Sequence, residues 1–199
     1  MREETRAFRQ EEIEAAAYAL LHERGYAGMS MLAVAKRARA SNETLYRWFG
    51  DKKGLALALV ARTTEATRRT IEAELAAERP PITILRDLGP VLLELLLGEH
   101  AIALNRAAPA DPTGELGQAI SEAGREVVAP LIGQVLRRAR KAGDLRFDDP
   151  GTAVGLYLSL LVGDLQIRRV IGRDPEPTAA AIAQRAEMAY DQFLRLCAP

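Results

Sequence analysis

Cysteine and histidine are scarce in this 199-residue chain, and their scarcity limits the chemistry that it can perform. Its one cysteine, Cys197, excludes an intramolecular disulfide and makes a reducing compartment the natural setting. The two histidines, His22 and His100, lie far apart in the sequence and form no pair with the spacing of metal ligands. A phosphate-binding loop and a glycine-rich nucleotide fingerprint are also missing. We therefore expect no catalytic residues, no metal site and no cofactor, and we do not expect an enzyme.

Long apolar runs are missing as well. The segment Val91–Leu97, which is interrupted by Glu94, falls well short of the roughly 18 residues that a membrane span needs. The first six residues, Met-Arg-Glu-Glu-Thr-Arg, lack the apolar core of a signal peptide. These two absences lead us to expect no membrane association and a cytoplasmic location.

The period-two alternation of a β-strand is absent too, as are internal repeats and low-complexity tracts. Apolar residues instead recur at the three- and four-residue spacing of helices, and a hydrophobic content of 48% is ample for a packed core. We predict an all-α fold of about nine helices. The expected helices are 10–24, two short ones between 30 and 49, 52 to about 78, 82–97, 101–107, 114–142 with a kink near 127–130, 150–171 and 177–196.

The signals that start and stop helices divide this chain into two parts. Ser30 and Asp51 are expected N-caps because their side chains can accept from a free backbone N–H. Gly25 and Gly98 are expected stops, and Pro80-Pro81 ends the long helix because neither proline can donate to it. We expect a domain at residues 1–55 and a second at 56–199, connected by the long helix at about 52–79.

The segment from Ser30 to Lys53 has the pattern of a helix-turn-helix, two short helices joined by a four-residue turn. Apolar spacing places Met31 and Val34 on one face of the first helix. Leu45 and Phe49 form an i,i+4 pair that can anchor the second helix. This anchoring leaves polar and aromatic side chains for solvent or a partner: Asn42, Glu43, Thr44, Arg47 and Trp48.

Charge is distributed unevenly, although the formal net charge is zero. Residues 1–62 carry 11 Lys and Arg against 8 Asp and Glu, and residues 63–199 carry 16 against 19. Between Leu32 and Arg62 there are 7 basic and 2 acidic residues, which makes a local charge of +5. A solvated surface would explain such a count by itself. Because the charge coincides with the helix-turn-helix, we interpret it as a surface that faces phosphate.

Residues in and around this motif resemble the N-terminal domain of the TetR/AcrR family of transcriptional regulators. The resemblance covers roughly residues 9 to 60 and rests on Thr44-Leu45-Tyr46-Arg47-Trp48-Phe49, Asp51-Lys52-Lys53, Leu55, Arg24-Gly25-Tyr26 and Ser30-Met31. The chain departs from the family pattern at Arg39, where glycine is usual, and at Lys53-Gly54. Arg39 must therefore hold the turn without glycine's freedom at positive φ.

The resemblance implies a role for each matching position. Asn42, Glu43, Thr44 and Arg47 match positions that reach base edges, where Arg can read guanine and Asn can read adenine. Ser30, Tyr46, Trp48 and Lys52 match positions that hold phosphates and set the register.

Other interpretations stay open at these positions. Glu43 either accepts from cytosine N4 or is repelled by DNA, and Tyr46 and Trp48 are alternatively core aromatics. Arg2, Arg6 and Arg9 form either an arm over the DNA backbone or minor groove, or a disordered end.

The last two expected helices are apolar on more than one side, so they must be buried on more than one side. Gly155 and Gly163 permit close approach of another helix. The segment is similar to the C-terminal domains of some of these regulators, where the final two helices form a four-helix bundle with their copies. The resemblance thus implies a homodimer, with burial inside one chain as the alternative. The expected contact residues are Val154, Leu158, Leu161, Leu165, Ile182, Ala186 and Phe193.

A regulator of this family is expected to hold a small-molecule effector in its C-terminal domain. An aromatic content of 5% argues against a large pocket built on stacking. Candidate lining residues are Leu88, Leu92, Leu96, His100, Leu104, Arg106, Gln134, Tyr157 and Leu161. The function that follows is a dimeric repressor that binds a pseudo-palindromic operator in double-stranded DNA and is released by an effector. The alternative is a helical dimeric protein-interaction module, or a DNA-binding protein without small-molecule control.

Overall fold

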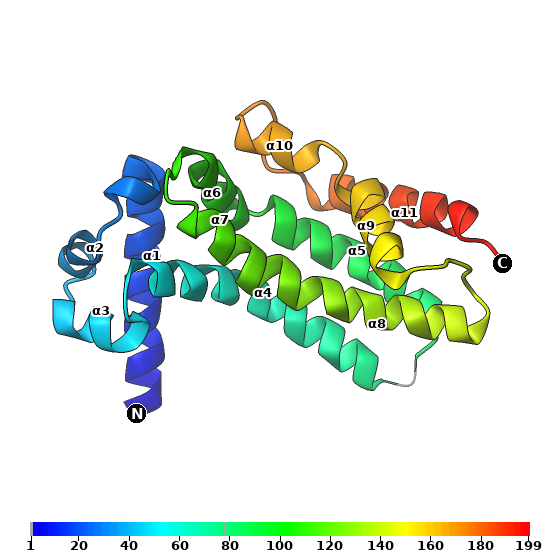
Figure 1. Ribbon diagram of the computed structural model, residues 1–199, viewed down its shortest axis with the longest axis horizontal. Helices are drawn as coiled ribbons and strands as arrows, with labels where there is room; N and C mark the ends of the chain where they lie inside the picture. The colour runs from blue at the N-terminus through cyan, green and yellow to red at the C-terminus, as the bar shows by residue number, and fades with distance from the viewer. Residues whose placement is uncertain (1, 78) are drawn as a thin grey trace. The chain divides into compact units, whose positions relative to one another are not determined.

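The computed structural model describes residues 2–77 and 79–199, with side chains from residue 6 onward. Every regular element in these ranges is helical, as the sequence predicts (Figure 1). The helices are α1 (Arg2–Gly28), α2 (Met31–Arg37), α3 (Asn42–Phe49), α4 (Lys52–Ala76), α5 (Pro81–Leu97), α6 (Glu99–Ala107), α7 (Glu115–Ile120), α8 (Glu126–Ala142), α9 (Pro150–Val162), α10 (Leu165–Val170) and α11 (Ala179–Leu196). None of the described helices is long and apolar enough to cross a membrane.

Contacts divide the chain into two compact units. The first unit comprises Met1–Arg62 and Ala103–Gly124, and the second comprises Thr63–Ile102 and Arg125–Pro199. The division differs from the boundary after residue 55 that the sequence suggests, because residues 103–124 join the N-terminal helices. Both α4 and α6 begin in one unit and end in the other.

The core of the first unit is built from α1, α2, α3 and the beginning of α4, together with α6 and α7. Ile13, Leu45 and Leu55 are fully buried in it. Leu104 and Leu116, which lie far along the chain, are buried in the same cluster at 2% and 0% exposure. The first unit is therefore completed by a segment that sequence alone would place in the second domain.

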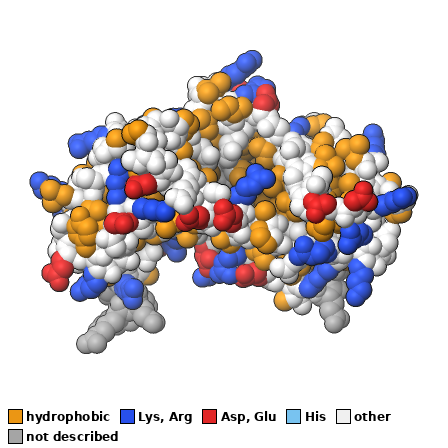
Figure 2. Space-filling model, in the orientation of Figure 1, with side chains coloured by type: hydrophobic (Ala, Val, Ile, Leu, Met, Phe, Trp, Pro, Cys, Tyr) orange, Lys and Arg blue, Asp and Glu red, His pale blue; other side chains and the backbone are white. Residues whose placement is uncertain are grey.

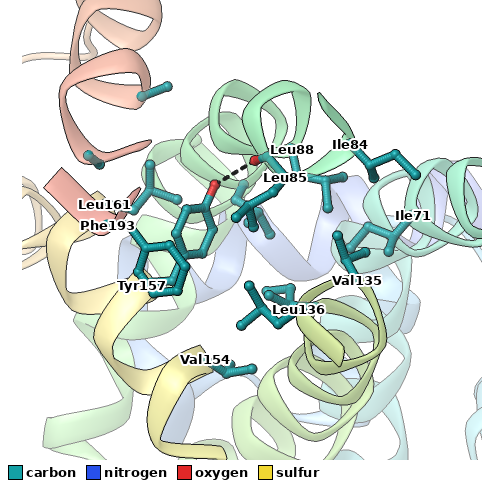
Figure 3. Packing of buried hydrophobic residues seen from close by; sticks show 14 of the residues in the cluster. Ile71, Ile84, Leu85, Leu88, Val135, Leu136, Val154, Tyr157, Leu161 and Phe193 are labelled. Atoms are coloured by element: carbon teal, nitrogen blue, oxygen red, sulfur yellow. Dashed lines mark hydrogen bonds between the residues drawn. The ribbon is translucent and has the colours of Figure 1, made fainter. Parts of the chain in front are cut away.

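In the second unit, α5 packs against α8, α9 and α11. Figure 3 shows Tyr157 of α9 between these helices, beside Phe193 of α11. The Tyr157 hydroxyl donates to the Leu85 carbonyl at 3.0 Å, and the two rings meet edge to face with centroids 5.3 Å apart. Burial raises the pKa of the Tyr157 hydroxyl, so it remains a neutral donor. A large aromatic thus joins three helices without leaving an unpaired polar atom.

The signals that start helices act where expected. The Ser30 hydroxyl accepts from the Ala33 N–H at 3.2 Å, and the Asp51 carboxylate accepts from the Gly54 N–H at 2.7 Å. Both predicted N-caps are confirmed. The long helix α4 ends at Ala76, and its predicted end at Glu78 falls outside the described residues.

The structure corrects three helix boundaries. α1 begins at Arg2 rather than Gln10, and it is kinked at Gly25, whose φ of 65° and ψ of −179° are not helical. The predicted single helix at 114–142 is interrupted by a π-helical turn at Ser121–Arg125, upstream of the kink expected at Pro130.

The predicted helix at 150–171 is two helices, because α9 ends before Gly163. Gly163 has a φ of 51°, and the Arg185 guanidinium of α11 donates to the carbonyls of Leu160 and Leu161 at 2.6 and 2.8 Å. These bonds satisfy carbonyls that the helix end leaves free. A residue 24 positions away therefore helps to end α9.

Candidate nucleic-acid interface

The helix-turn-helix is built by α2 and α3, which are joined by residues 38–41 as the sequence predicts. Met31, Val34 and Ala35 of α2 are buried against the first unit's core. Ser30 stays exposed at the start of α2, beside a surface hollow of about 490 Å³. The hollow is lined by Leu20, Arg24, Ser30, Leu32, Ala33, Lys36 and Arg37.

The second helix of the motif is fixed by its start and by one apolar anchor. Ser41 caps α3 by accepting from the Thr44 N–H at 3.0 Å, and its hydroxyl lies 2.8 Å from the Thr44 hydroxyl. Leu45 is fully buried, and Phe49, four residues later, is partly buried. This anchoring orients the opposite face of α3 outward.

That outward face carries the side chains that the sequence assigns to DNA. Asn42, Glu43 and Arg47 are exposed, and Tyr46 is 51% exposed. Their positions, two consecutive pairs four residues apart, place them on one side of the helix. The alternative that Tyr46 is a core aromatic is therefore wrong.

Thr44 and Trp48, also predicted DNA contacts, are only partly exposed. The Trp48 ring meets Phe49 edge to face at 6.4 Å between centroids. The guanidinium of Arg6 on α1 lies 5.5 Å from the centroid of the Trp48 ring, within the range of a cation–π interaction. Trp48 thus packs against the core of the first unit, and part of its side chain stays exposed.

The last predicted contact residue, Lys52, lies at the start of α4. Its ammonium is 3.9 Å from the centroid of the Tyr26 ring. Tyr26 is 2% exposed and donates through its hydroxyl to the Glu115 carboxylate of α7 at 3.0 Å. Burial, and then the hydrogen bond to Glu115, raise the pKa of the Tyr26 hydroxyl. Lys52 is consequently held above the face of a neutral ring.

Ion pairs reduce the positive charge of this surface. Arg37 pairs with Glu23 at 2.6 Å, and Arg62 pairs with Glu11 at 3.1 Å. Two of the seven Lys and Arg residues between Leu32 and Arg62 are thus paired with acids outside this segment. Five unneutralised cations remain, and the segment's own acidic residues are Glu43 and Asp51. The excess falls from five charges to three. Figure 2 shows that Lys, Arg, Asp and Glu side chains are interspersed on the face in view.

The candidate effector residues do not gather around one point. Leu88, Leu92, Tyr157 and Leu161 are buried in the core of the second unit, where Figure 3 shows three of them. Leu96 is partly exposed, and Leu104 is buried in the first unit's core. The polar candidates His100, Arg106 and Gln134 are exposed.

Most candidate dimer residues are already used inside one chain. Five of them are at most 9% exposed: Val154, Leu161, Ile182, Ala186 and Phe193. Leu158 and Leu165 are partly exposed. Met188 on α11, which is not among the predicted contact residues, is 46% exposed. Most of the apolar side chains of these helices are therefore buried in the protomer's own core.

Two features of the site were missed from the sequence. One is the contact of Arg9 with the turn between α2 and α3: Arg9 was predicted to form an arm or a disordered end, whereas its guanidinium donates to the backbone of this turn. The other is the segment 103–124, which contributes Glu115, Leu116 and the Gln118 side chain that accepts from Lys53 at 2.9 Å. These contacts join residues 29 to 89 positions apart, and no local pattern signals them. Among the described residues, no group of three metal-ligating side chains is present.

Comparisons with known proteins agree with this geometry. Residues 13–59 match the family model of bacterial regulatory proteins of the tetR family, and residues 83–198 match the C-terminal domain of AefR-like transcriptional repressors. The second match alone covers more than half of the chain. No curated protein matches the chain significantly.

Solved structures of similar proteins include a TetR transcriptional regulator from Agrobacterium tumefaciens, at 30% identity and a TM-score of 0.73 over 95% of this chain and 94% of that one. The flavonoid-responsive regulator FrrA is also 30% identical, with a TM-score of 0.71 over 97% and 98% of the two chains. FadR of Bacillus subtilis, solved in complex with stearoyl-CoA, shares the fold at 16% identity and a TM-score of 0.74 over 93% and 97%.

These relatives are transcriptional regulators rather than enzymes. The exposed polar face of α3, the two family matches and the similarity over nearly the whole chain lead to one conclusion. The chain belongs to the TetR family of DNA-binding transcriptional regulators, with an AefR-like C-terminal domain.

Proposed function

We propose that the protein is a dimeric repressor that binds a pseudo-palindromic operator and is released from it by a small molecule. The observation that carries the proposal is the α3 surface, on which Asn42, Glu43, Tyr46 and Arg47 stand exposed while Leu45 anchors the helix. Because its target is genomic DNA, we place its action in the cytoplasm.

In this proposal α3 lies in the major groove. Arg47 can donate two hydrogen bonds to guanine O6 and N7, and Asn42 can pair with adenine N6 and N7. Glu43 accepts from cytosine N4, and the Thr44 hydroxyl can hydrogen-bond either to a donor or to an acceptor on a base edge. Ser30, Tyr46, Trp48 and Lys52 hold the phosphates and fix the register. Partly exposed Trp48 suits a phosphate contact, since its indole N–H is a donor and its ring is already anchored.

A twofold dimer presents two copies of α3 to half-sites at least one helical turn, about 34–36 Å, apart. We assign the contact to the outward sides of α9 and α11, because Leu158 of α9 and Met188 of α11 leave apolar surface there, next to Leu165 at the start of α10. The buried residues of the same helices support this contact from beneath.

We place the effector between α5, which carries Leu88 and Leu92, and α9, which carries Tyr157 and Leu161. FrrA is flavonoid-responsive, and FadR was solved in complex with stearoyl-CoA, whose acyl chain is apolar. The apolar character of the four side chains fits a ligand of that kind. α4 carries a change to the first unit, because it begins there and ends in the second.

A gel-shift screen of genomic fragments tests the proposal. The purified protein should retain a few fragments at moderate salt, and a footprint on them should show two related half-sites. Equally weak binding to all fragments would instead favour the protein-interaction module. Specific binding that no candidate effector weakens would favour constitutive DNA binding.

A further inference from the structure

The turn between α2 and α3 contains the feature that departs from the family pattern. Arg39 has a φ of 51°, and it is the one non-glycine residue with positive φ among the described residues. Side chains disfavour this left-handed conformation because Cβ crowds the following carbonyl oxygen. Glycine, which has no Cβ, would adopt it freely. Something else must therefore hold Arg39 in place.

Part of the restraint comes from the backbone. The Ala40 N–H donates to the Ala35 carbonyl at 2.9 Å, and the Arg39 N–H donates to the Lys36 carbonyl at 3.3 Å. These two bonds form a Schellman motif, whose left-handed position is most often glycine and is here Arg39. The motif ends α2 and directs the chain toward Ser41, the cap of α3. The conformation of Arg39 thus determines how α3 enters the motif.

The second restraint comes from α1. The Arg9 guanidinium donates through Nη1 to the Ala38 carbonyl at 3.3 Å and through Nη2 to the Arg39 carbonyl at 3.2 Å. Glu12, one turn further along α1, accepts from Nη1 at 2.8 Å and orients the group. The rigid fork of a guanidinium can span two adjacent carbonyls, whereas an ammonium presents a single point charge.

Arg6 lies one helical turn before Arg9 on the same side of α1, where its guanidinium covers the Trp48 ring of α3. Two cations of one helix face therefore contact the turn and the helix that follows it. Residues 6 to 9 lie within the helix α1 rather than in an irregular terminal segment.

We infer that Arg9 is a positioning residue for operator recognition, which holds the strained turn at Arg39 and thereby sets the orientation of α3. This inference rests on the proposed DNA-binding function. Arg9 touches no base in this scheme, so it acts through the turn, and it substitutes for the glycine that the chain lacks.

A double-mutant cycle of Arg9→Ala and Arg39→Gly tests the inference. Arg9→Ala should weaken operator binding about tenfold, equivalent to about 1.4 kcal/mol, and leave binding to unrelated DNA unchanged. In the Arg39→Gly background the same substitution should cost little, because glycine holds the turn unaided. Both Arg39→Gly and the double variant lack the Arg39 charge, so the effect of that charge on DNA binding cancels when these two proteins are compared. Equal losses in the two backgrounds would overturn the inference.

Arg9→Lys separates geometry from charge. If Arg9 contacts a phosphate directly, lysine should preserve binding, and Arg9→Ala should lower the salt slope of log affinity by about one. If Arg9 holds the turn, lysine should bind nearly as poorly as alanine, with the salt slope unchanged. Arg137→Ala, at an exposed position of α8 in the second unit, is the matched control and should bind as wild type.

Trp48 provides a readout that does not need DNA, because it is the chain's one tryptophan. Arg9→Ala should increase quenching of Trp48 fluorescence by acrylamide. Adding Arg39→Gly to this variant should return the quenching to the wild-type level, while far-UV circular dichroism stays unchanged in all variants. If wild type bound no operator but this quenching pattern appeared, the DNA-binding proposal would fail and the role of Arg9 in the turn would stand. Quenching that is identical in all variants would refute that role.

Discussion

Neighbouring side chains of α3 differ in burial and therefore in role. Leu45 is fully buried and holds the helix, whereas Arg47, two residues later, is exposed on the outward face. Lys52 also stands near this surface, but its ammonium lies over Tyr26. The two cations are therefore placed differently, which gives them different expected effects on binding.

Arg47→Ala should cost about 1–3 kcal/mol of operator affinity and relax specificity at one base position, because a base-reading arginine is lost. Lys52→Ala should weaken all sequences alike and lower the salt slope by about one. Affinities for an operator and for a set of point-mutated operators, measured at several salt concentrations, distinguish the two. Lys141→Ala, on exposed α8 surface, is the control. The same uniform loss in both variants would mean that Arg47 does not read a base.

Among the elements, α7 has the most unexpected position, because it completes the core of the first unit with Leu116 and Ala119. Its start is held by Asp111, which is 8% exposed and accepts from the Leu116 N–H at 3.0 Å and from the Thr113 hydroxyl at 2.7 Å. The π-helical turn at Ser121–Arg125 follows α7 at the boundary between the units. α7 is thus fixed at its beginning and irregular after its end.

The Asp111 contacts predict a pH dependence of stability. Burial raises the pKa of the carboxyl, but the hydrogen bonds from Leu116 and Thr113 outweigh it and hold the pKa below its usual value. A lowered pKa in the folded state stabilises the fold above the unfolded value of about 3.9, and this stabilisation is lost as pH falls through the folded pKa. Asp111→Asn should therefore lower the unfolding midpoint at pH 7, and the difference from wild type should shrink below about pH 4.

Thermal unfolding followed at pH 7, 5, 4 and 3 measures this difference. Asp148→Asn, at an exposed position before α9, serves as the control and should change the midpoint equally little at each pH. A difference for Asp111→Asn that stays constant down to pH 3 would show that the carboxylate charge is not the stabilising group.

At the scale of the whole molecule, we predict a homodimer that forms through α9 and α11. Because Met188 is 46% exposed, Met188→Glu and Met188→Lys should place charges in the interface without disturbing the core. Light scattering should give the dimer mass for wild type and for the control Lys141→Glu, and a shift toward the monomer for the two interface variants. A monomer mass for wild type at micromolar concentration would rule out the dimer.

Coupling between effector and operator is the second prediction at this scale. If an effector weakens operator binding, linkage requires that operator DNA weaken effector binding by the same factor, typically 5–150-fold for a coupling of about 1–3 kcal/mol. Effector affinity measured with and without saturating operator tests this. Leu92→Ala, in the second unit's core, should change the effector response more than it changes operator affinity without effector. Equal effector affinities in the two conditions would mean that the sites are not coupled.

Features that depend on neighbours within a turn or two of helix could be predicted from the sequence. These include the all-helical class, the caps at Ser30 and Asp51, the start of a helix beside Pro80-Pro81, and the division of α3 between Leu45 and its exposed polar face. Such features follow from backbone hydrogen bonding and apolar periodicity, which act over a few residues.

Tertiary structure alone decided which distant residues meet. Arg9 reaches a turn 29 residues away, Arg185 helps to end α9, and Glu115 meets Tyr26 across 89 positions. Tertiary packing also buries Leu161 and Phe193 in the protomer's own core, although both are apolar enough for an interface. The free energy of these contacts depends on how whole helices pack, and a helix's apolar pattern shows that it must be buried without showing against what.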